Sequence, residues 1–167
     1  MKKLISAVLI NTIIVSSVAY AGVDRIQKLH HEQELECLAL NIYFETSASS
    51  LADAMAVSDV VLNRVNSNKF PDTVCKVVKQ GKQDSNGNMR RHKCQFSWYC
   101  DGKADTPKNS DAWDTSRKYA RDIYVHGEYI GITEGATHYH ASYVKPFWAP
   151  TLDRITRIGS HIFYRKK

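Results

Sequence analysis

The sequence lacks several features that would place it in common protein classes. No internal repeat, low-complexity tract or linker-like segment divides its 167 residues, a length that corresponds to about one domain. Its four cysteines include no C-x-x-C pair, so the usual spacing of a cysteine zinc site is absent. No RNA- or DNA-reading motif accompanies the basic clusters, and we expect no nucleic-acid partner. One catalytic or binding domain is the simplest interpretation.

The sequence also lacks an apolar run of the length that a membrane span needs. The longest run, residues 4–18, is interrupted by two polar residues, whereas a spanning helix takes about 20 mostly apolar residues. Two lysines precede this run and a small-x-small site follows it at residues 19–21, a pattern typical of a secretory signal peptide. We expect residues 1–21 to be cleaved before Gly22, leaving no stable membrane anchor.

Acidic side chains are fewer than basic ones. The chain has 23 Lys and Arg residues against 17 Asp and Glu residues, and cleavage of the signal peptide removes two of those lysines, so the excess falls to about +4. The usual interpretation of such an excess is solubility, and the functional one is attraction to an anionic polymer such as cell wall, nucleic acid or lipid headgroups. We expect a monomer that is exported to the periplasm or the extracellular space.

All four cysteines lie after the expected cleavage site. An even number of cysteines in an exported chain indicates two disulfides rather than free thiols. Three pairings are compatible with the sequence. Proximity along the chain favours Cys37–Cys75 and Cys94–Cys100, because the second pair closes a short loop.

Hydrophobic periodicity predicts a mainly helical protein. Residues 31–46 carry an apolar stripe at three- and four-residue steps. A second helix is predicted over residues 50–65, and we expect it to be the central buried one because few of its positions are polar. Ser50 is expected to cap this helix while Asp53 answers it three positions later. A short helix should begin near Pro71 and end at Gly81.

The remainder of the chain contains one further helix and two segments of strand character. We expect a loop over residues 81–93 and a helix over residues 110–126. Residues 136–142 and 157–165 are short, aromatic and β-branched, which is typical of a small hairpin or of paired strands. The fold class predicted from these patterns is α+β, mainly helical, with a small β hairpin or sheet.

Glu45 continues the apolar stripe of the first helix, three residues after Ile42. Loss of hydration disfavours a charged carboxylate, so its pKa should rise and the group can hold a proton near neutral pH. A general acid that protonates a sugar oxygen has this property. The alternative is that Glu45 lies at the rim of the helix and is solvated.

Six sequence blocks resemble, in order, those of a family of cell-wall hydrolases. This family includes the catalytic domain of spore cortex-lytic enzymes, and the resemblance is to the version found in Gram-negative bacteria and their phages. It covers roughly residues 34–165. The blocks are CLALNIYFE, AVSDVVLNRV, FPDTVCKVVKQ, CQFSWYCDG, GATHYHASYVKPFWA and RIGSHIFYR.

The resemblance implies a lysozyme-like single domain, here residues 22–167, that cleaves peptidoglycan between N-acetylmuramic acid and N-acetylglucosamine. Glu45 matches the glutamate that is the catalytic acid of the family, and no cofactor is implied. Family members usually continue this glutamate as Ala-Arg-Gly-Glu, whereas this chain has Thr46-Ser47-Ala48-Ser49. Our interpretation is that the missing second acid is a structural cap, a role that Ser49 or Ser50 can fill. A wall-binding relative without activity is the alternative.

The absence of an obvious second acid favours a lytic transglycosylase. A glycoside hydrolase usually needs two carboxyl groups beside the bond, whereas a transglycosylase can use one, as acid and then as base, to form a 1,6-anhydro ring. The resemblance points the same way. Asp59, Asp101 or Glu134 could be brought near Glu45 by folding, so a hydrolytic muramidase stays open.

The segment around "THYH" supplies further candidate residues. His138 and His140 share one face of a strand, as two metal ligands would, and a zinc-dependent amidase is therefore a further alternative. No third ligand stands in a recognisable motif, so we predict that no metal is bound. Amide, hydroxyl and aromatic side chains would suit a sugar groove together with these histidines, although they could equally serve ordinary packing. The candidates are Gln95, Ser97, Thr137, Tyr139 and Tyr143.

Overall fold

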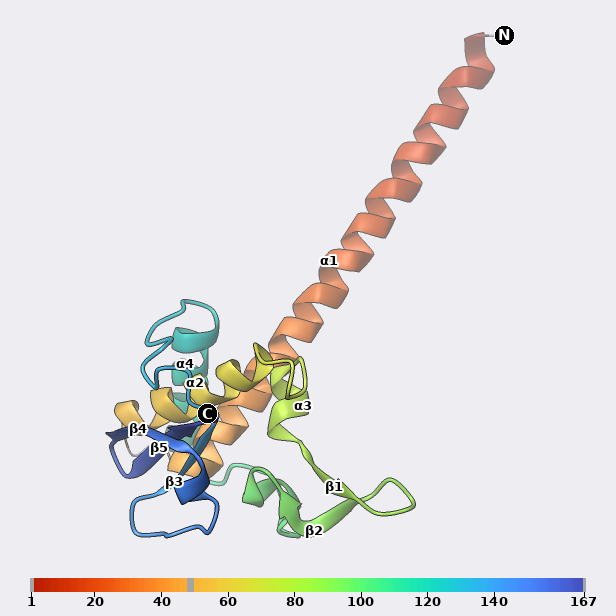
Figure 1. Ribbon diagram of the computed structural model, residues 1–167. Coiled ribbons are helices and arrows are strands. Elements are labelled where there is room, and N and C mark those ends of the chain that lie inside the picture. Colours follow the sequence, from red (N-terminus) through yellow and green to blue (C-terminus); the bar gives the residue numbers. More distant parts are fainter. Residues whose placement is uncertain (1, 48–49, 167) are drawn as a thin grey trace. The chain divides into compact units, whose positions relative to one another are not determined.

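The computed structural model describes residues 2–47 and 50–166 (Figure 1). Side chains are described from Val23 onward within these ranges. The chain divides into two compact units, Met1–Gln33 and Glu34–Lys167. The described part of the first unit belongs to helix α1 (Lys2–Thr46). The side chains of residues 1–21, the expected signal peptide, are not among those that the structure describes. Among the described residues, no helix has both the length and the apolar character of a membrane span.

The end of α1 and helix α2 (Leu51–Val65) form the centre of the second unit. The apolar stripe predicted for the first helix is buried: Leu35, Leu38, Ala39 and Ile42 are each less than a tenth exposed. Helix α2 begins after Ser50, whose hydroxyl accepts a hydrogen bond from the Asp53 backbone N–H at 3.3 Å. The predicted cap is therefore present.

The second half of the predicted cap is wrong. The Asp53 carboxylate does not return to Ser50; Oδ1 accepts hydrogen bonds from the backbone N–H and the hydroxyl of Ser160, both at 3.0 Å, and lies 2.7 Å from Nδ1 of His161. Asp53 is buried, and folding brings these three donors to it from more than 100 residues away along the chain. Long-range donors therefore replace the local one.

Helix α3 (Val74–Val78) is joined to α1 by the Cys37–Cys75 disulfide. The Glu34 carboxylate on α1 accepts hydrogen bonds from the backbone N–H groups of Val74 and Cys75. These two links hold the start of α3 against α1. The helix lies within the predicted range, residues 71–81.

Residues 81–93 form a hairpin, not the predicted loop. Strands β1 (Gly81–Gln83) and β2 (Met89–Cys94) pair antiparallel. Most of their side chains are exposed and charged or polar, so the sequence shows no apolar alternation. The connecting turn is closed by the Asp84 carboxylate, which accepts from the backbone N–H groups of Asn86 and Asn88, with Gly87 at a φ of 82°.

The second predicted disulfide, Cys94–Cys100, closes the segment after this hairpin. The loop contains the short 3-10 helix η1 (Ser97–Cys100), whose last residue is the second cysteine. Helix α4 (Ser110–Tyr124) follows, close to the predicted 110–126, with the Asn109 side chain accepting from the Ala112 backbone N–H as its cap.

A three-stranded antiparallel sheet closes the fold, in the order β3-β5-β4. Strand β3 (His138–Ala141) pairs with β5 (His161–Arg165), which confirms the predicted pairing of the two aromatic segments. Strand β4 (Asp153–Ile158) is preceded by the 3-10 helix η2 (Ala149–Thr151). It starts four residues before the predicted strand segment 157–165. The register places His138 opposite Tyr164 and His140 opposite Ile162.

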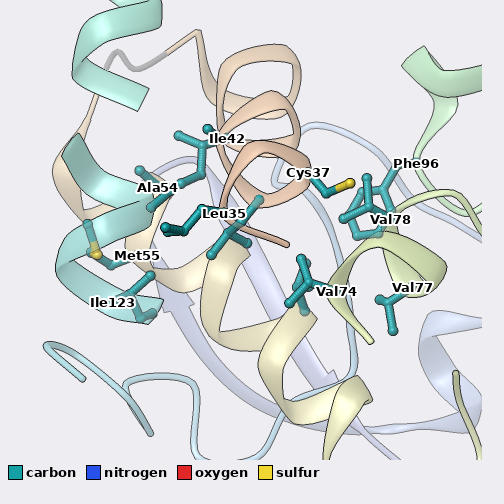
Figure 2. Close-up of a cluster of buried hydrophobic side chains, with 14 of the residues drawn as sticks. Leu35, Cys37, Ile42, Ala54, Met55, Val74, Val77, Val78, Phe96 and Ile123 are labelled. Carbon is teal, nitrogen blue, oxygen red and sulfur yellow. The ribbon is translucent and has the colours of Figure 1, made fainter. Parts of the chain in front are cut away.

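The core of the second unit lies among its four helices. Figure 2 shows side chains of α1, α2, α3 and α4, such as Ile42, Met55, Val74 and Ile123, converging in one cluster with Phe96. Full burial of each such side chain stabilises the fold by about 1.5–3 kcal/mol. This cluster fixes the end of α1, and with it the position of Glu45.

Candidate active site

A pocket of about 420 Å³ opens at the end of α1. Its walls come from α1, the last turn of α2, the segment after β2, strand β3 with the loop that follows it, and the first residue of β5. Polar, charged and aromatic side chains predominate among the twelve lining residues: Glu45, Arg64, Gln95, Phe96, Ser97, His138, Tyr139, His140, Ala141, Tyr143, Trp148 and His161.

Glu45 is half-buried in the wall of this pocket. The Tyr139 hydroxyl donates a hydrogen bond of 2.9 Å to its Oε2 atom. Burial raises the pKa of Glu45 above its ordinary value of 4.5, although this hydrogen bond and the charges of His161 and Arg64 oppose the rise. The group can therefore carry a proton at a higher pH than a solvated glutamate, as its place on the apolar stripe predicts.

Tyr139 is held as a donor. Burial, the Glu45 charge and the hydrogen bond to Glu45 raise the pKa of its hydroxyl well above the ordinary value of 10. The hydroxyl is therefore protonated throughout the neutral range, and Oε2 of Glu45 has a permanent hydrogen-bond donor. Strand β3 fixes this ring, whose neighbours include His161 at 5.2 Å and Phe163 at 5.7 Å between ring centroids.

Arg64 brings a buried positive charge to the same pocket. Its side chain extends from the last turn of α2, and the residue is only 4% exposed. Nε donates to the Thr137 carbonyl oxygen at 2.8 Å, and the guanidinium carbon lies 5.3 Å from the ring centroids of both Phe70 and Phe96. Burial lowers the pKa of Arg64, against the attraction of Tyr139 and Glu45.

His161 is the second basic group beside Glu45. Its Nδ1 atom lies 2.7 Å from Asp53 Oδ1, and both side chains are about nine-tenths buried. Burial would raise the pKa of Asp53, but the hydrogen bonds from His161 and Ser160 outweigh it and the pKa lies below the ordinary 3.8. An ionised Asp53 thus fixes the orientation of an imidazole that lines the pocket.

His138 and His140 both line the pocket and both rings contact Trp148, at 5.8 and 5.7 Å between centroids. Each ring has local partners: the Thr137 hydroxyl lies 3.0 Å from Nδ1 of His138, and the Tyr164 hydroxyl lies 2.9 Å from Nε2 of His140. Burial, Arg64 and Lys166 lower the pKa of His138. Within the described parts of the chain, no group of three His, Cys, Asp or Glu side chains is placed to hold a metal ion.

The structure brings most of the predicted groove residues together. Gln95, Ser97 and Tyr143 line the pocket with the three β3 residues. Thr137 is the exception, because it lines a separate hollow of about 250 Å³ with Asn63 and Phe70. The reason is that Thr137 precedes β3, where its carbonyl accepts from Arg64 and its hydroxyl turns to His138.

Sequence reasoning did not identify Arg64, Phe96 and His161 as pocket residues. Arg64 is the basic residue of the apolar segment "VLNRV", and a cation in such a helix is a signal that can be read from the sequence. His161 gives no local signal, because its partner Asp53 stands 108 positions earlier.

The other acids considered as partners of Glu45 lie elsewhere. Asp59 is buried and accepts hydrogen bonds from Gly131 and Thr133. Asp101 lines a different pocket, and Glu134 is exposed. Among the described residues that line the pocket, Glu45 is therefore the only one with a carboxyl side chain.

Two solved structures resemble this chain. The catalytic domain of the germination-specific lytic transglycosylase SleB from Bacillus anthracis is 26% identical, with a TM-score of 0.60, and the match covers 79% of this chain and 93% of that domain. The catalytic domain of the Bacillus cereus SleB protein, 24% identical over 80% of this chain and 91% of its own length, shares the fold with a TM-score of 0.57. These matches confirm the predicted lysozyme-like, mainly helical fold.

The search of curated proteins found no match. The profile of the cell wall hydrolase family, in contrast, matches residues 48–164, which is well over half of the chain. The matched region begins three residues after Glu45 and includes the other pocket residues. The chain therefore belongs to the cell wall hydrolase family, and it is a peptidoglycan enzyme of the glycosidase type.

Proposed function

We propose that this enzyme is a lytic transglycosylase that cleaves the glycan strand between N-acetylmuramic acid and N-acetylglucosamine and leaves 1,6-anhydro ends. The observation that carries the proposal is the lone carboxyl group among the described pocket residues, Glu45, whose pKa is raised by burial. A hydrolase of the usual kind uses two carboxyl groups. The Bacillus anthracis relative, itself described as a lytic transglycosylase, supports the same choice.

In the proposed reaction, Glu45 first acts as an acid. It donates its proton to the glycosidic oxygen, the bond from this oxygen to C1 of N-acetylmuramic acid breaks, and N-acetylglucosamine leaves with a free hydroxyl. The Glu45 carboxylate then accepts the proton of the 6-hydroxyl of the same N-acetylmuramic acid, and that oxygen bonds to C1. Glu45 ends the cycle protonated, and no water is consumed.

The neighbours of Glu45 suit both halves of this cycle. Oε2 accepts from Tyr139, which leaves Oε1 to carry the proton in the first half. In the second half, the charge of Arg64 and the Tyr139 hydrogen bond stabilise the carboxylate. The amide of Gln95 and the hydroxyl of Ser97 are proposed to form hydrogen bonds with the sugar hydroxyl and acetamido groups, and the ring of Tyr143 is proposed to contact the sugar.

Digestion of purified sacculi followed by mass spectrometry of the products tests the reaction. We expect 1,6-anhydro ends, formed equally well in excess EDTA. Reducing ends alone would show a muramidase, and free peptide stems whose release stops in EDTA would show a zinc-dependent amidase. Binding to sacculi without soluble products would show an inactive wall-binding relative.

A single substitution tests the role of Glu45. Glu45→Gln preserves the shape of the side chain but has no proton to donate, so the release of fragments should fall at least about a thousandfold while the fold is retained. Glu36→Gln, at an exposed position on the same helix, is the matched control and should leave turnover unchanged. Full activity of the Glu45 variant would refute the assignment.

We also propose that residues 1–21 direct export to the periplasm or the extracellular space. The lysines, apolar run and small-x-small site of the sequence support this proposal, as do the two disulfides. N-terminal sequencing of the exported protein should give Gly22 as the first residue. A first residue of Met1 would show that the segment is retained.

A further inference from the structure

Arg64 has more hydrogen-bonding capacity than the protein uses. A guanidinium carries five N–H donors in a planar fork. Nε is satisfied by the Thr137 carbonyl, whereas Nη1 is buried and has no hydrogen-bond partner among the described residues. The residue is 4% exposed and lines the pocket beside Glu45.

The surroundings hold this cation without neutralising it. The rings of Phe70 and Phe96 both lie 5.3 Å from the guanidinium carbon, close enough for cation–π attraction. Within the described residues, no Asp or Glu side chain forms an ion pair with Arg64. Glu45 acts on it only at longer range. A buried donor without an acceptor destabilises a protein. A ligand that brings an acceptor would form the hydrogen bond that the free protein lacks, and this bond would favour binding.

We propose that the Arg64 guanidinium donates a hydrogen bond to a carbonyl or carboxylate oxygen on the sugar that occupies the pocket, and that Arg64 thereby determines substrate specificity. This inference rests on the proposed function, because a glycan strand of peptidoglycan offers two such groups. One is the acetamido carbonyl, and the other is the carboxyl of the lactyl substituent. A planar, rigid fork suits either group better than a lysine would.

The first test measures glycan affinity in the Glu45→Gln protein, which does not turn over. Peptide-free glycan strands should bind about 10- to 100-fold more weakly when Arg64→Lys is added, because the positive charge stays and the forked donor is lost. Arg117→Lys is the matched control. Arg117 also lies over an aromatic ring, that of Trp113 at 5.8 Å, but on α4 and away from the pocket, and its replacement should leave the Kd unchanged.

Two further probes separate the two oxygen sources. A weaker Kd that is also seen with an N-acetylglucosamine oligomer, which has no lactyl group, assigns the acetamido carbonyl. A weaker Kd that persists with de-N-acetylated strands, which keep the lactyl group, assigns the carboxyl. An unchanged Kd with every probe overturns the proposal.

An NMR measurement keeps the test valid if Arg64→Lys does not fold. The guanidinium Nη–H signals of Arg64 in the Glu45→Gln protein should shift on saturation with glycan strands, whereas those of Arg117 should not. A stationary Arg64 signal at saturation overturns the inference. The proposed function fails by a different result, the absence of anhydro ends in digests by the unsubstituted enzyme, so the two failures are distinguishable.

Discussion

A group that gives a proton and then takes one back needs surroundings that tolerate both its neutral and its charged form. The role proposed for Glu45 has this requirement, and two opposed influences act on the group. Its position at the end of a buried stripe favours the neutral acid, while Tyr139, His161 and Arg64 favour the carboxylate. The net effect is a pKa above that of a solvated glutamate, with burial as the largest cause.

Removal of the Tyr139 hydroxyl should disturb this balance in a known direction. Tyr139→Phe deletes the hydrogen bond that lowers the pKa of Glu45, so the pKa should rise further. Because the free enzyme must hold the proton, the alkaline limb of the kcat/KM profile should move to higher pH, and turnover at neutral pH should fall about tenfold as the carboxylate loses its donor.

The pH profile of sacculus digestion measures this shift. Tyr129→Phe, at a position that is 47% exposed and outside the pocket, should leave the profile in place. An alkaline limb that moved to lower pH in Tyr139→Phe would contradict the account given for Glu45.

Asp53 should contribute to stability in a pH-dependent way. Its pKa is lowered in the folded state, so its contribution is present above the ordinary pKa of 3.8 and is lost as the pH falls through the lower folded value. Asp53→Asn should reduce the free energy of unfolding at neutral pH by about 1–3 kcal/mol. The difference from the unsubstituted protein should shrink below pH 3.8.

Urea unfolding at a series of pH values tests the role of Asp53. Asp72→Asn is the control, because Asp72 forms an exposed pair with Lys76, four positions further along the chain. If the difference in unfolding free energy between Asp53→Asn and the unsubstituted protein grew on acidification, the ionised form of Asp53 would not be the stabilising one.

At the scale of elements, local patterns predicted the helices better than the strands. The stripe of α1, the Ser50 cap of α2 and the extent of α4 follow from neighbouring residues, and all are present. The β1–β2 hairpin was missed because Arg90, Arg91 and Lys93 give its second strand no apolar face. Pocket residues such as Arg64 and His161 depend on contacts across the fold, which periodicity along the chain does not describe.

The two disulfides join elements at different distances along the chain and should differ in their effects. Cys37 and Cys75 are separated by 38 positions, and Cys94 and Cys100 by 6. By loop-closure entropy, replacing the first pair with serines should cost about 4 kcal/mol of unfolding free energy, and replacing the second pair about 2 kcal/mol. Thermal unfolding of the two double variants measures the difference. A larger loss from the second pair would contradict the entropic account.

At the scale of the whole molecule, positive charge dominates. The 23 basic residues exceed the 17 acidic ones, and the exposed hairpin strand β2 alone carries Arg90, Arg91 and Lys93. Attraction of exposed charges to an anionic wall is screened by salt over about 10 Å at 0.1 M. Adhesion of the enzyme to its polymer should therefore include a part that is sensitive to ionic strength.

Sacculus binding by the Glu45→Gln protein should weaken severalfold as sodium chloride rises from about 0.02 M to about 0.3 M. Co-sedimentation with sacculi measures the bound fraction at each concentration. Replacement of Arg90, Arg91 and Lys93 by glutamine should reduce this dependence. If the protein with the unsubstituted hairpin bound sacculi equally well at every salt concentration, the excess charge would serve solubility alone.

The short loop closed by Cys94 and Cys100 contains Gln95, Phe96 and Ser97, three residues of the pocket wall. One side of the pocket is thus tied together by a bond that requires an oxidant to form. By the export proposed above, a newly synthesised chain would lack this tie in a reducing cytoplasm and would acquire it after crossing to an oxidising compartment. Completion of this side of the pocket would thereby follow export.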